Sequence, residues 1–236
     1  MAKNQLLIND ELSLYHGAIT LNNIGVALTK YNRVNEAKRV LRSSAFVLKA
    51  EANADVVLKN SLEWASSQMA TARAEQGDAS EPSLKIQVLS DQHLSSPSFS
   101  WDGLVMSDDH IFVRIEPRDA GEWVDPEPIA SIVIYNLSMI FSYEAIVLEH
   151  TDKVLAARKL AVLSNVLSSR GDEEGTGPST LLLLLLQARV LFYLSLAVGT
   201  REEVSNYLDR FSRSANQVKN CDALVKRAGE NGAPAA

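Results

Sequence analysis

Cysteine is almost missing from this sequence, and basic charge is in deficit. Cys221 is the single cysteine among 236 residues, so a disulfide within one chain and a cysteine-based zinc site are both excluded. The 23 basic residues are outnumbered by 29 acidic ones, and the net charge of −6 disfavours binding to a phosphate backbone. We therefore expect no nucleic-acid partner and a reducing intracellular compartment, either cytoplasmic or nuclear. Residues 1–10 also lack the apolar core of a secretory signal.

Motifs that carry catalysis or hold metals are also lacking. The sequence has no Gly-x-Ser-x-Gly motif, no glycine-rich phosphate loop and no dinucleotide fingerprint. Its histidines lie in separate segments, without the spacing that metal ligands require. They are His16, His93, His110 and His150. The sequence therefore predicts no cofactor, no metal site and no enzymatic activity.

One compact cluster of ionisable side chains leaves an enzyme as the third hypothesis. It consists of Asp108, Asp109 and His110, directly before a predicted strand. Such a cluster is typical of a polar turn, and this interpretation outweighs a role in acid–base catalysis.

Two parts of the chain have apolar residues at every third or fourth position, as helices with one buried face require. In the first part this spacing predicts helices over about 10–30, 34–51 and 54–75. In the second part it predicts helices over about 129–149, 151–170 and 179–198, and a last one opened by the capping box Thr200 to Glu203.

Between these parts, glycine, proline and alternating apolar residues indicate β-structure. Residues 84–88 and 111–116 alternate as half-buried strands do, and a third strand is expected near 99–106. The predicted organisation is a helical block over 1–76, a β-rich insertion over 77–127, a second helical block over 128–220 and a flexible tail over 221–236. We expect the blocks to form one cooperative domain.

Three predicted helices share one stripe of large and small residues, with a small residue always in third place. The stripes are Ala37, Leu41, Ala45 and Leu48; Ala156, Leu160, Ser164 and Leu167; and Val204, Leu208, Ser212 and Ala215. Each stripe follows a more apolar helix across a short turn. This arrangement predicts three stacked antiparallel helix pairs, about the smallest number that buries a continuous core.

The stretch Leu-Asn-Asn-Ile-Gly-Val-Ala-Leu at 21–28 resembles a tetratricopeptide repeat. Ile24-Gly25 stands where that family has Leu-Gly on its first helix, and Ala37 stands at the small position of the second helix. The family's tryptophan, tyrosine and closing proline are missing, so the resemblance is to a divergent member. It implies a mainly α protein, an α-solenoid of stacked helix pairs that carries the small β-rich insertion.

In this family the first helix of each pair lines a groove for a peptide or a partner helix. Asparagines and basic residues on this face hold peptide backbone or carboxylate groups. The resemblance therefore makes Asn22, Asn23, Asn136 and Arg189 candidate partner contacts. The alternative is that these side chains satisfy neighbouring backbone groups. Trp101 gives the β-rich insertion a second candidate surface, since exposed aromatic residues anchor partners.

These observations favour a protein-binding adaptor, scaffold or assembly factor. The alternative is a membrane-associated subunit, because the apolar helices 129–148 and 181–198 approach the ~20 residues that span a bilayer. Arg189 opposes this alternative, at a cost of roughly 2.5–3.5 kcal/mol inside a membrane. A buried core explains the same apolarity.

Overall fold

The computed structural model describes residues 2–49, 53–75, 84–89, 110–116, 126–170 and 178–231. This part of the chain is mainly helical. Its elements are α1 (Ala2–Lys30), α2 (Val34–Leu48), α3 (Ala54–Glu75), β1 (Leu84–Leu89), β2 (His110–Ile115), α5 (Pro126–Ile146), the 3₁₀ turn η2 (Thr151–Lys153), α6 (Val154–Arg170), α7 (Pro178–Val198) and α8 (Arg201–Asn231).

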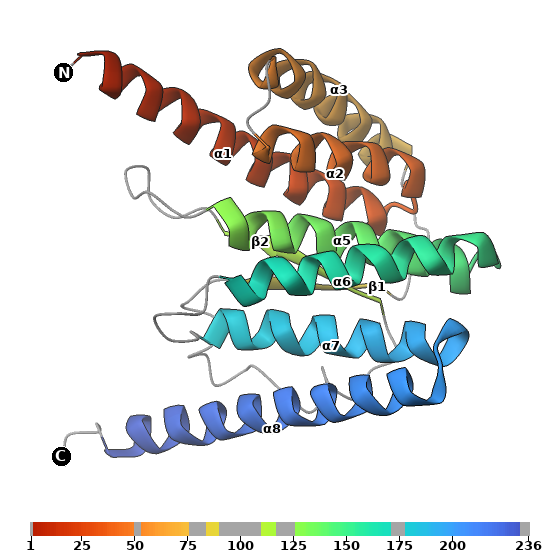
Figure 1. Cartoon of the computed structure of the whole chain (residues 1–236). Coiled ribbons are helices and arrows are strands. Elements are labelled where there is room, and N and C mark those ends of the chain that lie inside the picture. Colours follow the sequence, from red (N-terminus) through yellow and green to blue (C-terminus); the bar gives the residue numbers. More distant parts are fainter. Residues whose placement is uncertain are drawn as a thin grey trace.

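The helices form a row of packed hairpins (Figure 1). Consecutive helices pack most extensively as the pairs α1–α2, α5–α6 and α7–α8. Contacts of α2 with α5, and of α6 with α7, join one pair to the next. Helix α3 packs on the side of the α1–α2 pair away from α5, so the order of elements in space differs from their order along the chain (Figure 1).

Small residues allow α1 and α2 to approach closely. A Cβ added to Gly25 would lie 2.8 Å from Leu41 Cγ, and Ala37 is fully buried. The turn between the helices places Asn32 at φ 56°, a left-handed conformation that asparagine tolerates. Gly25 and Ala37, which carry the resemblance to a tetratricopeptide repeat, thus lie where the two helices meet.

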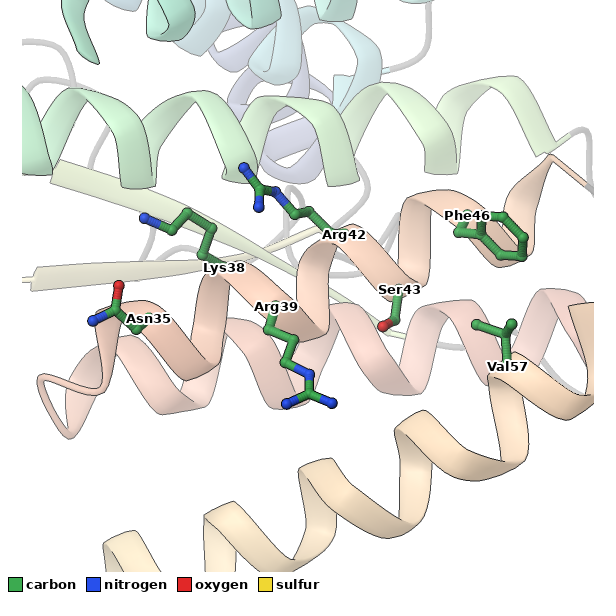
Figure 2. Close-up of a pocket in the computed structure, with 7 residues that line it drawn as sticks. All are labelled: Asn35, Lys38, Arg39, Arg42, Ser43, Phe46 and Val57. Carbon is green, nitrogen blue, oxygen red and sulfur yellow. The ribbon is translucent and has the colours of Figure 1, made fainter. Parts of the chain in front are cut away.

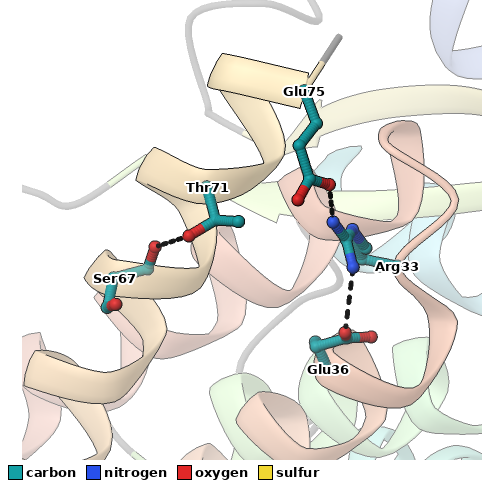
Figure 3. A network of polar contacts seen from close by, with 5 residues as sticks. All are labelled: Arg33, Glu36, Ser67, Thr71 and Glu75. Atoms are coloured by element: carbon teal, nitrogen blue, oxygen red, sulfur yellow. Dashed lines mark hydrogen bonds and ion pairs between the residues drawn. The ribbon is translucent and has the colours of Figure 1, made fainter.

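Arg33 connects the start of α2 to the end of α3 (Figure 3). Its guanidinium pairs with Glu75 and lies 3.5 Å from the Glu36 carboxylate. Within α3, the Thr71 hydroxyl donates to the Ser67 carbonyl at 3.1 Å. Because these groups are partly solvated, each ion pair contributes only about 0.2–1 kcal/mol to stability.

The predicted capping box opens α8. The Thr200 backbone N–H donates to Glu203 Oε2 at 2.9 Å, and the Glu203 N–H donates to Thr200 Oγ1 at 3.2 Å. The pKa of the Glu203 carboxyl is lowered, mainly by the hydrogen bond from the Thr200 N–H and to a smaller extent by the guanidinium of Arg158 on α6. The spacing Thr-x-x-Glu correctly located this helix start.

The first two predicted stripes lie at helix contacts, but the second is displaced. Ala37 and Leu41 are fully buried. On α6, Leu160 is only partly buried against the core. The buried residues of α6 are Val154, Ala157, Ala161, Ser164, Asn165 and Ser168. The predicted stripe therefore lies beside the buried face, with Ser164 shared between them.

The third predicted stripe is mostly wrong: Ala215 is buried, but Leu208 is 43% exposed and Ser212 is also exposed. Helix α8 packs through Tyr207 and Phe211, which the predicted stripe did not include, and through Ala215, which it did. The Phe211 ring stacks on Phe192 of α7, with centroids 6.3 Å apart. Helix α8 ends the row and packs mainly on α7, so a narrow aromatic face is sufficient.

Helix ends differ from the predicted ones. Helix α1 begins at Ala2, ahead of the expected start near residue 10. Helix α2 ends at Leu48, and α8 continues to Asn231, inside the range 221–236 that composition assigned to a flexible tail. Because a helix end is worth only a few hydrogen bonds, composition locates it poorly.

Strands occur where the alternation predicted them, and they pair in parallel, with Leu84 opposite His110 and Leu89 opposite Ile115. The expected strand near 99–106 lies outside the described residues. One face of β2 is apolar and buried, and it carries Ile111, Val113 and Ile115. The opposite face is buried in part, because Phe112 is 1% exposed while Arg114 is exposed. β2 lies against α1 and α5, which accounts for this burial.

One helical stretch in the described part, Glu127–Ile146, is long and apolar enough to cross a membrane by length and composition. Neighbouring elements bury 72% of that window. The apolar stretch Leu182–Val198 is shorter, and α6 and α8 pack against the α7 helix that contains it. Contact with neighbouring helices therefore accounts for the apolarity of the first stretch and for the buried residues of the second, whereas Leu196 and Val198 are exposed.

Candidate functional site

Side-chain amides from two helices hold the backbone of β2 along one edge. In an extended strand, the backbone N–H and C=O groups of alternate residues point to the same edge. The groups that face α1 and α5 belong to Ile111, Val113 and Ile115. We call Asn22, Asn23 and Asn136, which bind the backbone groups of Val113 and Ile115, the asparagine site.

Asn136 on α5 pairs with both backbone groups of Val113. Its Oδ1 accepts the Val113 N–H at 2.8 Å, and its Nδ2 donates to the Val113 carbonyl at 2.7 Å. Nδ2 also donates to Asn22 Oδ1 at 2.9 Å. The side chain thus offers β2 the donor and acceptor that a neighbouring strand would offer, and it is fully buried.

Asn23 on α1 repeats this pairing two residues further along the strand. Its Oδ1 accepts the Ile115 N–H at 2.9 Å, and its Nδ2 donates to the Ile115 carbonyl at 2.7 Å. Asn22 adds a bond from Nδ2 to the Val113 carbonyl at 3.2 Å. The two-residue spacing of the pairs selects an extended chain, because only there do alternate residues face one way.

These bonds involve the backbone of β2 and therefore do not depend on its side-chain sequence. The β2 side chains contribute separately, through burial of Ile111, Phe112, Val113 and Ile115. The site as a whole is suited to hold an extended segment with apolar side chains.

Tyr135 extends the site at the start of β2. Its hydroxyl donates to the Ile111 carbonyl at 2.9 Å, and its side chain is fully buried. Burial raises the pKa of the Tyr135 hydroxyl, and the charge of Arg189 opposes this rise without cancelling it. The hydroxyl therefore stays protonated, and remains a donor, in strongly alkaline solution.

Tyr135 predicts a loss of stability in alkali. Above the ordinary tyrosine pKa of 10.0, the unfolded chain releases this proton while the folded chain keeps it, so the free energy of unfolding falls as pH rises. Tyr135→Phe should lower the free energy of unfolding at pH 8 by about 1 kcal/mol, because the hydrogen bond to Ile111 is lost. Between pH 9 and roughly 11, the free energy of unfolding should fall less steeply in this variant than in the unmodified chain. Urea unfolding across this range measures both. Parallel declines in the two proteins would contradict this role.

The structure brings together three of the five predicted contact residues. Asn22, Asn23 and Asn136 meet at β2, where they form hydrogen bonds with backbone groups of Val113 and Ile115. They therefore satisfy neighbouring backbone groups, as the alternative interpretation expected, and these groups belong to an extended segment. Arg189 lies on α7, is 4% exposed and has its guanidinium carbon 5.6 Å from the Tyr193 ring centroid. Trp101 lies outside the described residues. Tyr135 was missed, although a tyrosine inside an apolar helix signals a need for a hydrogen-bond partner.

The cluster proposed for an enzyme is only partly described. Asp108 and Asp109 lie outside the described residues, and His110 begins β2 with its ring edge-on to Tyr143 at 5.5 Å between centroids. Within the described ranges, no three histidine, cysteine or acidic side chains group as metal ligands would.

A second buried polar cluster connects α5, α6 and α7. Gln187 Nε2 lies 2.7 Å from Ser164 Oγ, 2.9 Å from Ser168 Oγ and 3.0 Å from Ser131 Oγ. Ser164 Oγ donates to the Ser131 carbonyl at 2.8 Å. These bonds satisfy the polar groups of apolar helices and fix how the helices align, which is a structural role.

No protein-family model, curated protein or solved structure matches this chain.

Proposed function

We propose that this chain is a protein-binding adaptor or scaffold that holds an extended segment of a partner protein between α1 and α5. One observation carries the proposal: Asn23 and Asn136 each pair with both backbone groups of a β2 residue, at positions two residues apart. Backbone pairing of this kind accepts many sequences, as an adaptor requires. Polar groups that served only the helices would not need this two-residue spacing.

A divergent tetratricopeptide-like solenoid is the architecture we propose for this function. Support comes from the row of helix hairpins and from the close approach of α1 and α2 at Gly25. The first helices of two pairs, α1 and α5, also face the same extended segment. This is the arrangement that the resemblance implies for a groove.

In this proposal β2 occupies the groove when no partner is present, and a partner segment exchanges with it. β2 then indicates what the groove accepts, namely an extended segment with apolar, mainly β-branched side chains. Because β2 belongs to the same chain, its effective concentration at the groove is on the order of millimolar or higher. A free peptide therefore competes poorly unless β2 is weakened.

The test weakens β2 and supplies the strand from outside. Val113→Pro removes the N–H that Asn136 accepts, so the resident strand loses its central pairing. A fluorescent peptide with the sequence of residues 109–117 should then bind this variant at least tenfold more tightly than the unmodified chain, as measured by anisotropy. Adding Asn136→Ala should abolish the gain.

Two controls make the result decisive. A peptide that carries proline in place of Val113 should not bind, because it lacks the same N–H. Circular dichroism must show that the helices of the Val113→Pro chain persist. The groove is refuted as the partner site if the folded Val113→Pro chain does not bind the peptide. It is also refuted if the Asn136→Ala substitution leaves peptide binding unchanged.

A further inference from the structure

The outer face of α2 carries a cluster of positive charge beside a hollow of about 470 Å³ (Figure 2). Helix α2 packs against α1, α3 and α5, and the hollow opens on the face left uncovered between α3 and α5. It is lined by Asn35, Lys38, Arg39, Arg42, Ser43, Phe46 and Val57, which we call the basic hollow. Three cations on two turns of one helix stand out in a chain of net charge −6.

Arg39 and Arg42 are held by aromatic rings. The guanidinium carbon of Arg39 lies 4.1 Å from the Trp64 ring centroid, and that of Arg42 lies 5.7 Å from the Phe141 centroid. A guanidinium placed over a ring still has N–H groups in its own plane that can bind an anion. Among the described residues, neither arginine has a carboxylate partner.

Lys38 differs from the two arginines because its charge is already balanced. Its ammonium pairs with the Glu144 carboxylate of α5, and the two side chains are 17% and 6% exposed. In Figure 2, Lys38 and Arg42 extend toward α5, whereas Arg39 extends toward α3. The charge available for a ligand is therefore that of Arg39 and Arg42, on either side of the hollow.

We propose that the basic hollow binds an acidic segment of a partner protein. In this arrangement, carboxylates pair with Arg39 and Arg42, and an apolar side chain packs against Phe46 and Val57. Two available arginines are too few for a phosphate polymer, and lipid surfaces are typically recognised by clusters of about 4–8 basic residues. The acidic character of the whole chain disfavours both of these anions as well.

The spacing of the hollow's residues indicates the pattern of the segment. Residues three or four apart on a helix have Cβ atoms about 5–6 Å apart, as do Arg39, Arg42 and Phe46 in turn. Alternate side chains of an extended peptide lie about 6.5–7 Å apart. An acidic, any, acidic, any, apolar peptide offers one carboxylate to each arginine, on either side of the hollow, and an apolar side chain to Phe46.

The test uses the full chain and a fluorescent ten-residue peptide that contains Glu-Ser-Glu-Ser-Leu. Anisotropy should show binding about tenfold tighter than that of a matched peptide with Gln for Glu, and weakening with added salt. The double variant Arg39→Gln with Arg42→Gln should lose this difference. The control variant, Arg201→Gln with Arg213→Gln, removes two exposed charges from α8. It should leave the difference in affinity between the two peptides unchanged.

A second variant guards against damage to the fold. Ser43→Glu adds a negative charge to the hollow and keeps both arginines, and it should weaken binding of the acidic peptide several-fold. Equal binding of the two peptides, or equal binding by both double variants, would overturn the proposal. Stronger arginine-dependent binding to phosphatidylserine vesicles than to the peptide would overturn it too. Asn136→Ala should not affect this binding, so failure here is separable from failure of the groove.

Discussion

Asn136→Ala is expected to lower the free energy of unfolding by about 2–5 kcal/mol, because it leaves buried polar groups without partners. The Val113 N–H loses its acceptor, and Asn22 Oδ1 loses the amide that donates to it. Each unsatisfied buried group costs roughly 1–3 kcal/mol. Urea unfolding followed by circular dichroism measures the loss.

Asn35→Ala is the matched control for this substitution. Asn35 is an exposed asparagine on α2, so its truncation should change stability by less than about 0.5 kcal/mol. A loss below about 1 kcal/mol for Asn136→Ala, similar to the control, would mean that β2 is not held by this amide.

Leu41→Ala should cost about 2–5 kcal/mol, because Leu41 is fully buried at the closest approach of α1 and α2. The smaller side chain leaves a cavity opposite Gly25, whose hydrogen cannot fill it. Thermal and urea unfolding both report this loss. The expected range reflects how far the two helices can collapse on the space left behind.

Leu208→Ala removes the same atoms from a residue that is 43% exposed, and it should cost less than about 1 kcal/mol. The pair therefore tests how the helices of the row are oriented. Equal losses for the two leucines would contradict the burial of the α2 stripe and the exposure of the α8 stripe.

Features that depend on neighbouring residues were predictable from the sequence. The helices follow from three- and four-residue spacing, and the start of α8 follows from Thr200 and Glu203. The two strands follow from alternation, because each of these signals lies within one segment. The third stripe failed because the same spacing exists on two faces of α8. Only contact with Phe192 of α7 decides that Tyr207 and Phe211 form the packed face.

The asparagine site could be predicted only in part. Resemblance to a tetratricopeptide repeat pointed to Asn22, Asn23 and Asn136 as residues that hold peptide backbone. The segment that they hold was not predictable, because Asn22 and Val113 are 91 positions apart and no local pattern encodes such a pairing. The basic hollow was missed for a similar reason, since Trp64 and Phe141, which hold the arginines, come from α3 and α5.

The two proposed surfaces lie on different helices and would serve one partner in different ways. The asparagine site is formed by α1 and α5, and the basic hollow belongs mainly to α2. A partner bound first through an acidic segment would have a raised effective concentration at the groove, where it must compete with β2. Both surfaces are therefore needed for tight binding in this scheme.

Hydrogen exchange at the Val113 and Ile115 amides is the most direct test of how β2 is held. Both N–H groups donate to asparagine side chains, so they should exchange slowly in the unmodified chain. Asn136→Ala should speed exchange at Val113 more than at Ile115, and Asn23→Ala should have the opposite preference. Rapid exchange at both amides in the unmodified chain, or rates that neither substitution changes, would contradict a strand held by side-chain amides.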